Sequence, residues 1–395
     1  MRVEKRLKTF QEFEEFLSTQ KNIKLFGAGN TTVEALGLLK KTAPGLLKNI
    51  QAIVATSVYG KPPHMENIPV LQYDSAAPSK KDWVILMIQE KYYGEVSGML
   101  EASGAKLVEF SGKILYEDTY QKVLGRLKPF IDGYPGNTAG LEIPRCTADG
   151  TLRAWSMWWQ GEEQAPEIVK ACLRSQRSRL PPEVEYTVIT EENYEKYVRV
   201  PRYIMEKVAR GDISRTHLSD IIRWMLLYQY GGLWMDATIL LVKPVKEEIF
   251  DYPIYTLAGQ MDYCGTDMMW TIPFMAAKPG EKLFRFLTCG FFDHLKEHDT
   301  VMEVDYLMSD YMIGIAYNTY PDVREKMRAI PQVRAKRVFK NTLLIEPYDA
   351  ERFQAYMREA DWLKMTWYKH DGAKEKQVED RGTEGTLYDF ICKNF

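Results

Sequence analysis

The sequence predicts a protein of the α/β class with two domains, each built around a parallel sheet. Short apolar runs typical of strands alternate with helical segments between residues 23 and 110, and again between residues 154 and 242. This alternation is characteristic of parallel sheets covered by helices. The 395 residues exceed what one hydrophobic core usually serves, and the stretch YPGNTAGLEIPRCTADG separates the two blocks. We therefore predict domains over residues 1–130 and 151–395, joined by a linker over residues 131–150.

The composition excludes several classes of protein. Apolar residues make up 45% of the chain and charged residues 27%, and the net charge of -2 gives no electrostatic reason to bind nucleic acid. Five scattered cysteines without a CxxC pair argue against a disulfide framework and for a reducing compartment. The first residues are charged throughout, unlike a signal peptide, and no run approaches the ~20 apolar residues of a membrane span. We expect a soluble, cytoplasmic protein.

The first domain begins with a predicted helix over residues 3–18, since Val3, Leu7, Phe10 and Leu17 fall near one helical face. Strands and helices then alternate, which predicts a small parallel sheet. The predicted strands are 23–26, 50–55, 83–88 and 106–110, and the predicted helices are 31–41 and 92–102.

The turn after the strand at residues 23–26 contains Gly27-Ala28-Gly29, part of a dinucleotide-binding fingerprint. The third glycine is missing, because Thr32 stands in its place, and no acidic residue follows the second strand to hold a ribose. We therefore predict that this domain does not bind NAD tightly. The order of segments, with IPVLQYDS before the third strand, resembles Rossmann-like modules attached to sugar-modifying enzymes. Such a module holds a nucleotide or serves as a docking unit, and both alternatives stay open.

The alternation of strand and helix patterns is lost from about Glu117 to Gly150. We therefore predict the domain boundary near residue 130. The second domain opens with a predicted strand at residues 154–159. It continues with a helix that starts at Pro166 and a strand at residues 185–189. A helix around residues 203–209 then ends before Gly211.

The central stretch of the chain is the helix that follows. Asp220 and Arg223 lie three residues apart and share one helical face. The opposite, apolar face is formed by Leu218, Ile221, Ile222 and Met225.

Gly231 and Gly232 supply the left-handed turn that ends this helix. Residues 233–242 then form a nearly continuous apolar run, as expected of a strand covered on both sides. Asp236 interrupts that run. A carboxylate in such a place is costly without a partner, so we predict a functional role for Asp236 at the strand's end.

The segment SDIIRWMLLYQYGGLWMDAT, residues 219–238, resembles the central block of glycosyltransferases that use nucleotide-sugar donors. It is most similar to the capsular polysaccharide synthesis proteins, which are related to sugar transferases with a DxD motif. The upstream WWQGEEQAPEIVKACLRSQRS resembles the family's first strand, W-x-G turn and helix. The resemblance covers about the last 240 residues and is strongest over residues 155–242. It implies a GT-A-like, Rossmann-like domain with a mixed sheet, preceded here by the Rossmann-like module.

The resemblance also implies roles for individual residues. Trp159 is expected to stack on the base of the donor, with Gln160 beside it at the end of the first strand; a core role for Trp159 is the alternative, and Trp158 or Trp155 is then the core tryptophan. Asp220 and Arg223 correspond to the family's acid and base that contact sugar hydroxyls and neighbouring acids. The alternative is a helix ion pair worth a few tenths of a kcal/mol when exposed.

Asp236 matches the first acid of the DxD motif and is expected to hold Mn²⁺ or Mg²⁺ against the diphosphate. Thr238 replaces the second acid; a hydroxyl can bind such an ion but adds no charge. In related enzymes, segments near the end of the chain close over the diphosphate. Trp367 and His370 are the candidates here, with His370 as a third metal ligand.

A different enzyme class is suggested by His294-Leu-Lys-Glu297-His298, which spells the H-x-x-E-H pattern of zinc peptidases. A polar helical face is the alternative interpretation.

We favour a hexosyltransferase that moves a sugar from a UDP-type donor to a glycan, lipid-linked glycan or capsular polysaccharide precursor, with retention of configuration. The other hypothesis is a non-catalytic nucleotide-sugar-binding or scaffold protein. Peripheral membrane association and the oligomeric state stay open.

Overall fold

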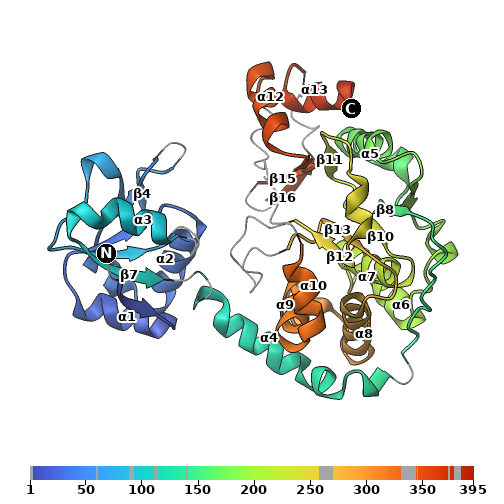
Figure 1. Cartoon of the computed structure of the whole chain (residues 1–395), viewed down its shortest axis with the longest axis horizontal. Coiled ribbons are helices and arrows are strands. Elements are labelled where there is room, and N and C mark those ends of the chain that lie inside the picture. Colours follow the sequence, from blue (N-terminus) through green and yellow to red (C-terminus); the bar gives the residue numbers. More distant parts are fainter. Residues whose placement is uncertain are drawn as a thin grey trace. The chain divides into compact units, whose positions relative to one another are not determined.

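The α/β class is confirmed by a computed structural model of the chain (Figure 1). Contacts between residues divide it into two compact units, Met1–Lys122 and a second unit of Val123–Met261 with Met268–Phe395. The structure describes residues 3–58, 61–88, 93–110, 112, 114–138, 141–257, 270–330, 344, 346–371, 374–377 and 384–395.

The first unit is built on a seven-stranded sheet with the order β1-β7-β6-β2-β3-β5-β4. All neighbouring strands are parallel except β4 and β5. The inner order β5-β3-β2-β6-β7 is that of a Rossmann-like domain. Its first strand in the sequence, β2, lies at the centre. The strands are β1 (Val3–Leu7), β2 (Ile23–Phe26), β3 (Ile50–Ala55), β4 (His64–Met65), β5 (Ile68–Gln72), β6 (Trp83–Leu86) and β7 (Lys106–Phe110).

Three helices cover this sheet. The apolar sides of α1 (Phe10–Thr19) and α2 (Asn30–Thr42) pack with one set of buried strand residues, and α3 (Tyr93–Leu100) packs with the other set. The alternation along β3 shows the two faces, because Ile53 belongs to the first cluster and Val54 to the second.

The predicted helix over residues 3–18 was wrong in its first part. Residues Val3–Leu7 form the edge strand β1, which pairs in parallel with β7. The helix begins only at Phe10, where the Thr9 side chain accepts a hydrogen bond from the backbone N–H of Glu12. Threonine at this position satisfies one of the free donors at a helix start, which places the boundary there.

The predicted loss of pattern from residue 117 was also wrong as far as residue 133. The structure has a 20-residue helix, α4 (Ile114–Gly133). Within the second unit, Phe130 of this helix packs against Phe286, with ring centroids 5.3 Å apart. Tertiary packing therefore holds a helix that contains Pro129 in its interior.

The second unit contains a mixed five-stranded sheet with the order β12-β13-β10-β8-β9. Strands β9, β8 and β10 are parallel, whereas β13 is antiparallel to both of its neighbours. The strands are β8 (Arg153–Met157), β9 (Glu185–Ile189), β10 (Gly232–Met235), β12 (Ile254–Thr256) and β13 (Phe274–Ala277).

Helices surround this sheet, and a small C-terminal subdomain adds short strands (Figure 1). The helices are α5 (Glu167–Arg179), α6 (Arg202–Arg210), α7 (Arg215–Gln229), α8 (Lys282–Glu297), α9 (Met308–Thr319), α10 (Pro321–Arg328), α12 (Ala350–Glu359) and α13 (Leu387–Asn394). The further strands are β11 (Ile239–Leu241), β14 (Trp362–Lys364), β15 (Tyr368–Asp371) and β16 (Lys374–Gln377). None of the helices in the described ranges is long and apolar enough to cross a membrane.

The apolar run over residues 233–242 is not one strand, as the sequence suggested, but two strands in different sheets. β10 lies inside the five-stranded sheet, and β11 pairs with β14 in a separate two-stranded sheet. The chain turns between them, where the N–H of Ile239 donates to the carbonyl of Asp236 at 2.9 Å. The turn brings Asp236 and Thr238 to the edge of the sheet.

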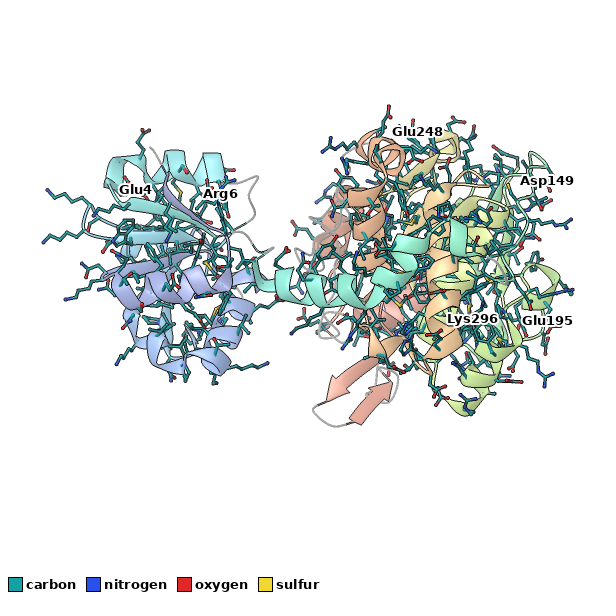
Figure 2. All side chains as sticks on the ribbon, turned by 90° about the horizontal axis from the view of Figure 1, so that it is seen from below. Glu4, Arg6, Asp149, Glu195, Glu248 and Lys296 are labelled. Atoms are coloured by element: carbon teal, nitrogen blue, oxygen red, sulfur yellow. The ribbon has the colours of Figure 1, made fainter. Side chains whose placement is uncertain are left out.

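Charged side chains project from the surfaces of both units (Figure 2). Those labelled there are all exposed, as charged side chains normally are: Glu4, Arg6, Asp149, Glu195, Glu248 and Lys296.

Candidate functional site

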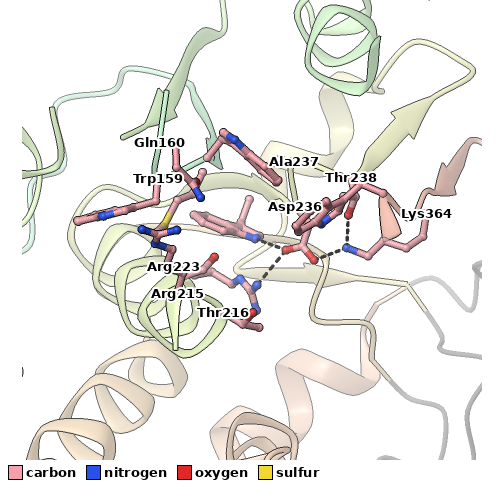
Figure 3. A pocket seen from close by; sticks show the side chains of 14 residues that line it. Trp159, Gln160, Arg215, Thr216, Arg223, Asp236, Ala237, Thr238 and Lys364 are labelled. Carbon is pink, nitrogen blue, oxygen red and sulfur yellow. Dashed lines mark hydrogen bonds and ion pairs between the residues drawn. The ribbon is translucent and has the colours of Figure 1, made fainter. Parts of the chain in front are cut away.

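A cavity of about 340 Å³ lies at the carboxyl ends of the parallel strands in the second unit (Figure 3). Ligands of open α/β sheets bind at this edge. The end of β8, the first turns of α7, the turn after β10 and the segment from β14 onward all contribute. The lining residues are Met157, Trp158, Trp159, Gln160, Arg215, Thr216, Ser219, Arg223, Trp234, Asp236, Ala237, Thr238, Lys364 and Trp367.

Asp236 is the most heavily engaged side chain of the site. Its Oδ1 accepts hydrogen bonds from Arg223 Nη2 and Trp234 Nε1, each at 2.9 Å. Its Oδ2 accepts from Lys364 Nζ at 2.6 Å. Burial raises the pKa of Asp236, but the charges of Lys364 and Arg223 outweigh this and hold it at about 2. The carboxylate is therefore ionised at neutral pH.

Arg223 links two acids. Its Nη1 lies 3.0 Å from Asp220 Oδ1, which is the helix ion pair of the alternative interpretation, and its Nη2 donates a hydrogen bond to Asp236 Oδ1. The guanidinium is 4% exposed and lies over the rings of Trp224 and Trp234, 5.1 and 4.9 Å from their centroids. Guanidinium stacking on aromatic faces fixes its plane.

Asp220 lies deeper than Asp236. Burial raises its pKa, Arg223 opposes this change, and the nearby Asp236 carboxylate adds to it. Its Oδ2 accepts a hydrogen bond from Ser309 Oγ at 3.2 Å. Asp220 does not line the cavity, and its predicted contact with sugar hydroxyls stays a prediction.

Lys364 was not predicted from the sequence. It ends β14 and lies opposite Ile239 in the β11–β14 pair. Its ammonium group contacts Asp236 Oδ2 and, at 2.5 Å, Thr238 Oγ1 (Figure 3). The sequence places it 126 residues after Thr238, and a three-residue strand carries no strong periodic signal.

Arg215, Thr216 and Ser219 in the first turns of α7 were not predicted either, although Arg223 on the same helix was. Arg215, Ser219 and Arg223 follow each other at intervals of four, so they share the helical face that lines the cavity. This spacing is visible in the sequence and could have identified the face. Arg215 and Thr216 are exposed to solvent at the cavity rim.

A buried glutamine supports the turn that carries Asp236. Gln176 Nε2 donates to the carbonyls of Asp236 and Ile239, at 2.9 and 2.8 Å. Its Oε1 accepts a hydrogen bond from Tyr186 OH at 2.7 Å. Gln176 is fully buried, so these contacts fix the position of the turn.

Both tryptophans of the WWQG turn line the cavity. Trp159 is 6% exposed and packs against Tyr194, with ring centroids 5.1 Å apart. Trp158 is half-buried and makes an edge contact with Trp367, with centroids 5.7 Å apart. Gln160 is exposed at the rim. The stacking role of Trp159 stays a prediction.

The predicted metal site of Asp236, Thr238 and His370 also stays a prediction. His370 belongs to β15, but its side chain lies outside the described part of the structure. Asp236 and Thr238 both form hydrogen bonds with the ammonium group of Lys364. Among the described residues, no group of three or more His, Cys, Asp and Glu side chains is arranged to hold a metal ion.

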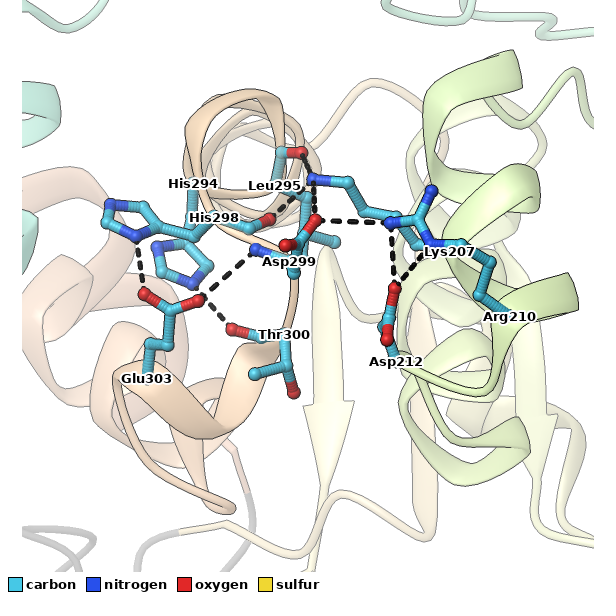
Figure 4. Close-up of polar contacts among 9 residues, drawn as sticks. All are labelled: Lys207, Arg210, Asp212, His294, Leu295, His298, Asp299, Thr300 and Glu303. Carbon is cyan, nitrogen blue, oxygen red and sulfur yellow. Dashed lines mark hydrogen bonds and ion pairs between the residues drawn. The ribbon is translucent and has the colours of Figure 1, made fainter.

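The H-x-x-E-H segment lies at the end of α8 (Figure 4), and none of its residues lines the cavity. The rings of His294 and His298 are stacked, 4.5 Å apart at 13°, instead of directing nitrogens at one point. His294 Nε2 lies 3.0 Å from the carbonyl of Thr300, and His298 Nδ1 lies 2.7 Å from Glu303 Oε2. This geometry does not support a peptidase site.

The same segment is predicted to make folding sensitive to pH. Burial lowers the pKa of His294, and the charges of His298 and Lys207 act in the same direction. The hydrogen bond with the Thr300 carbonyl and the charge of Glu303 only partly oppose this. The neutral ring is thus favoured in the folded state, and the stability it contributes is complete above about pH 6.5. It is lost as pH falls through the lowered pKa.

Melting temperatures from pH 8 to pH 5 should show this loss, and the His294→Gln variant should show a smaller one. His64→Gln, at an exposed position in the first unit, is the control and should behave as wild type. An unchanged pH profile for His294→Gln would contradict the assignment.

Comparison with known proteins identifies a family and a curated relative. A family model described as "Capsular polysaccharide synthesis protein" matches residues 139–381. The O-glycosyltransferase PaGT of Phomopsis amygdali is 27% identical over 107 residues, which cover 25% of this chain and 26% of that protein. The matched segment thus spans about a quarter of the relative's length.

Proposed function

The chain belongs to the family of capsular polysaccharide synthesis proteins, and from this premise we propose that it is a glycosyltransferase. It would transfer a hexose from a UDP-type nucleotide sugar to a glycan, a lipid-linked glycan or a capsular polysaccharide precursor. The partial likeness to an O-glycosyltransferase supports the reaction class. The UDP donor, the hexose and the retention of configuration rest on the resemblance of the central block.

One observation carries the proposal: cationic side chains and a helix start converge on a cavity that also has aromatic walls. Arg215, Arg223 and Lys364 line it, and so do Thr216 and Ser219 from the first turns of α7. A helix N-terminus and basic side chains attract phosphate oxygens. The cavity volume of about 340 Å³ lies in the range of small-molecule sites.

Chemistry at this site would depend on charge stabilisation. When the bond between the sugar and the diphosphate breaks, negative charge grows on the departing phosphate. Cations held in fixed positions stabilise that charge more in the transition state than in the bound donor. Asp236 would hold Arg223 and Lys364 in place for this task.

A donor screen tests the proposed function. Melting curves of the full chain are recorded with UDP-, GDP- and dTDP-sugars, and release of free nucleotide is measured for each. We expect a UDP-sugar to raise the melting temperature and to be slowly hydrolysed. Binding without any nucleotide release, also with glycan acceptors present, would instead support a non-catalytic nucleotide-sugar-binding protein. No shift with any nucleotide sugar would contradict both.

The stacking role gives a prediction for Trp159. Trp159→Ala should weaken UDP binding by about 1–3 kcal/mol, the range for base–aromatic stacking. Trp159→Phe keeps a flat ring against Tyr194 and should retain most of the affinity. Trp158→Ala should mainly lower the melting temperature. The measurement is calorimetric titration with UDP, and parental affinity in Trp159→Ala would contradict the assignment.

A further inference from the structure

The Asp236–Thr238 turn presents the two side chains that a DxD-type site would offer to a divalent cation. In this protein an ammonium group already bridges them. Lys364 Nζ lies 2.6 Å from Asp236 Oδ2 and 2.5 Å from Thr238 Oγ1. Two backbone interactions join the same segments. Ile239 pairs with Lys364 in the β11–β14 sheet, and the N–H of Met365 donates to the carbonyl of Thr238 at 2.7 Å. The position of Lys364 is therefore fixed by strand pairing.

The donor set does not fit an additional divalent ion. Asp236 Oδ1 accepts from Arg223 and Trp234, and Oδ2 accepts from Lys364. Magnesium and manganese need carboxylate oxygens that are free to coordinate. The carboxylates of Asp220 and Asp236 are already balanced by one guanidinium and one ammonium group. A further double positive charge here would face two fixed cations at close range.

The ammonium group can also reach a ligand. It has three N–H donors, and Asp236 and Thr238 are its hydrogen-bond partners among the described residues. The Lys364 side chain is 25% exposed and lines the cavity. A lysine acts on phosphate as a compact point charge, as it does in phosphate-binding loops.

We propose that the Lys364 ammonium takes the place of the divalent cation, so that the protein binds the diphosphate of its donor without a metal. This inference rests on the proposed function, because it assigns a role within the same site. Asp236 and Thr238 serve as the fixed support of that ammonium group instead of serving as metal ligands. The turn has one acid, Asp236, and a neutral second partner, Thr238. This agrees with an ammonium group, which carries one positive charge where a divalent cation carries two.

The test is calorimetric titration of the full-length protein with UDP, once in EDTA and once in excess Mn²⁺. Wild-type affinity should be the same within about twofold in both buffers. Lys364→Ala should bind UDP about 10- to 100-fold more weakly in EDTA, the loss expected for one charge-assisted hydrogen bond. Mn²⁺ should restore part of that affinity, because the change frees the Asp236 carboxylate and the Thr238 hydroxyl.

Two further variants serve as controls. Lys364→Met keeps most of the apolar stem of the side chain and removes the ammonium group. It should show the same loss of UDP affinity and replaces Lys364→Ala if that variant folds poorly. Lys243→Ala removes a half-exposed lysine that pairs with Asp361 and should leave UDP binding unchanged. Melting curves accompany each titration.

The outcomes distinguish a failure of the proposed role of Lys364 from a failure of the proposed function. Wild-type binding that needs Mn²⁺, or that strengthens more than tenfold with it, would overturn the role of Lys364 and leave the proposed function intact. Unchanged affinity in Lys364→Ala, in EDTA, would do the same. If wild type binds neither UDP nor any UDP-sugar in either buffer, the proposed function itself fails.

Discussion

Asp236→Asn is expected to lower the turnover of a UDP-sugar donor by at least ~100-fold, the scale seen when a preorganised electrostatic group is lost. The amide keeps the shape of the side chain but removes the charge that holds both Arg223 and Lys364. Without it, the two cations lose their common anchor at the place where, in the proposed reaction, the diphosphate would leave. The measurement is nucleotide release with saturating donor, in the presence and absence of acceptor.

Stability must be followed alongside activity, because Arg223 is almost fully buried and loses one partner. The assay temperature should therefore lie well below the melting temperature of the variant. Asp361→Asn is the matched control: its side chain is half exposed, pairs with Lys243 and does not line the cavity. A folded Asp236→Asn protein with parental turnover would rule out the electrostatic role.

Gly232→Ala is expected to have the largest effect on stability, on the order of 4 kcal/mol or more. Gly232 has φ of +91°, and a Cβ there would overlap the carbonyl oxygen of Arg153 on the neighbouring strand β8. Strand β10 cannot move away, because it lies between β8 and β13. The melting temperature of the second unit should fall by about 10 °C.

Gly211→Ala is the control for backbone strain alone. Gly211 has φ of +84°, but a Cβ there would meet nothing within 4 Å. It should cost only the ~1–2 kcal/mol of a left-handed conformation. Equal losses in the two variants would show that close approach of β8 and β10 does not explain the double glycine.

The parts of the second unit that follow local patterns could be predicted from sequence. The apolar spacing in α7, the positive φ of Gly231 and Gly232, and Asp236 at the end of β10 all appear where the sequence placed them. These features depend on residues close together in the chain. The acid within an apolar run was informative because such a charge needs partners.

Features that depend on distant pairing were not predictable. Lys364 reaches Asp236 only because β14 pairs with β11, and three-residue strands leave little trace in a sequence. The strand β1 was mistaken for helix because Val3 and Leu7 are four residues apart, which fits both periods. Helix α4 was missed because Gly125 and Pro129 obscure its apolar stripe, which only packing within the second unit makes effective.

The crystal structure of the wild-type protein with UDP, grown without added Mn²⁺ or Mg²⁺, tests the central claim most directly. We expect the uracil ring to lie against Trp159 and diphosphate oxygens to lie within hydrogen-bonding distance of Lys364 and Arg215. UDP bound elsewhere, for example only in the first unit, would contradict it. So would a diphosphate that points away from the first turn of α7.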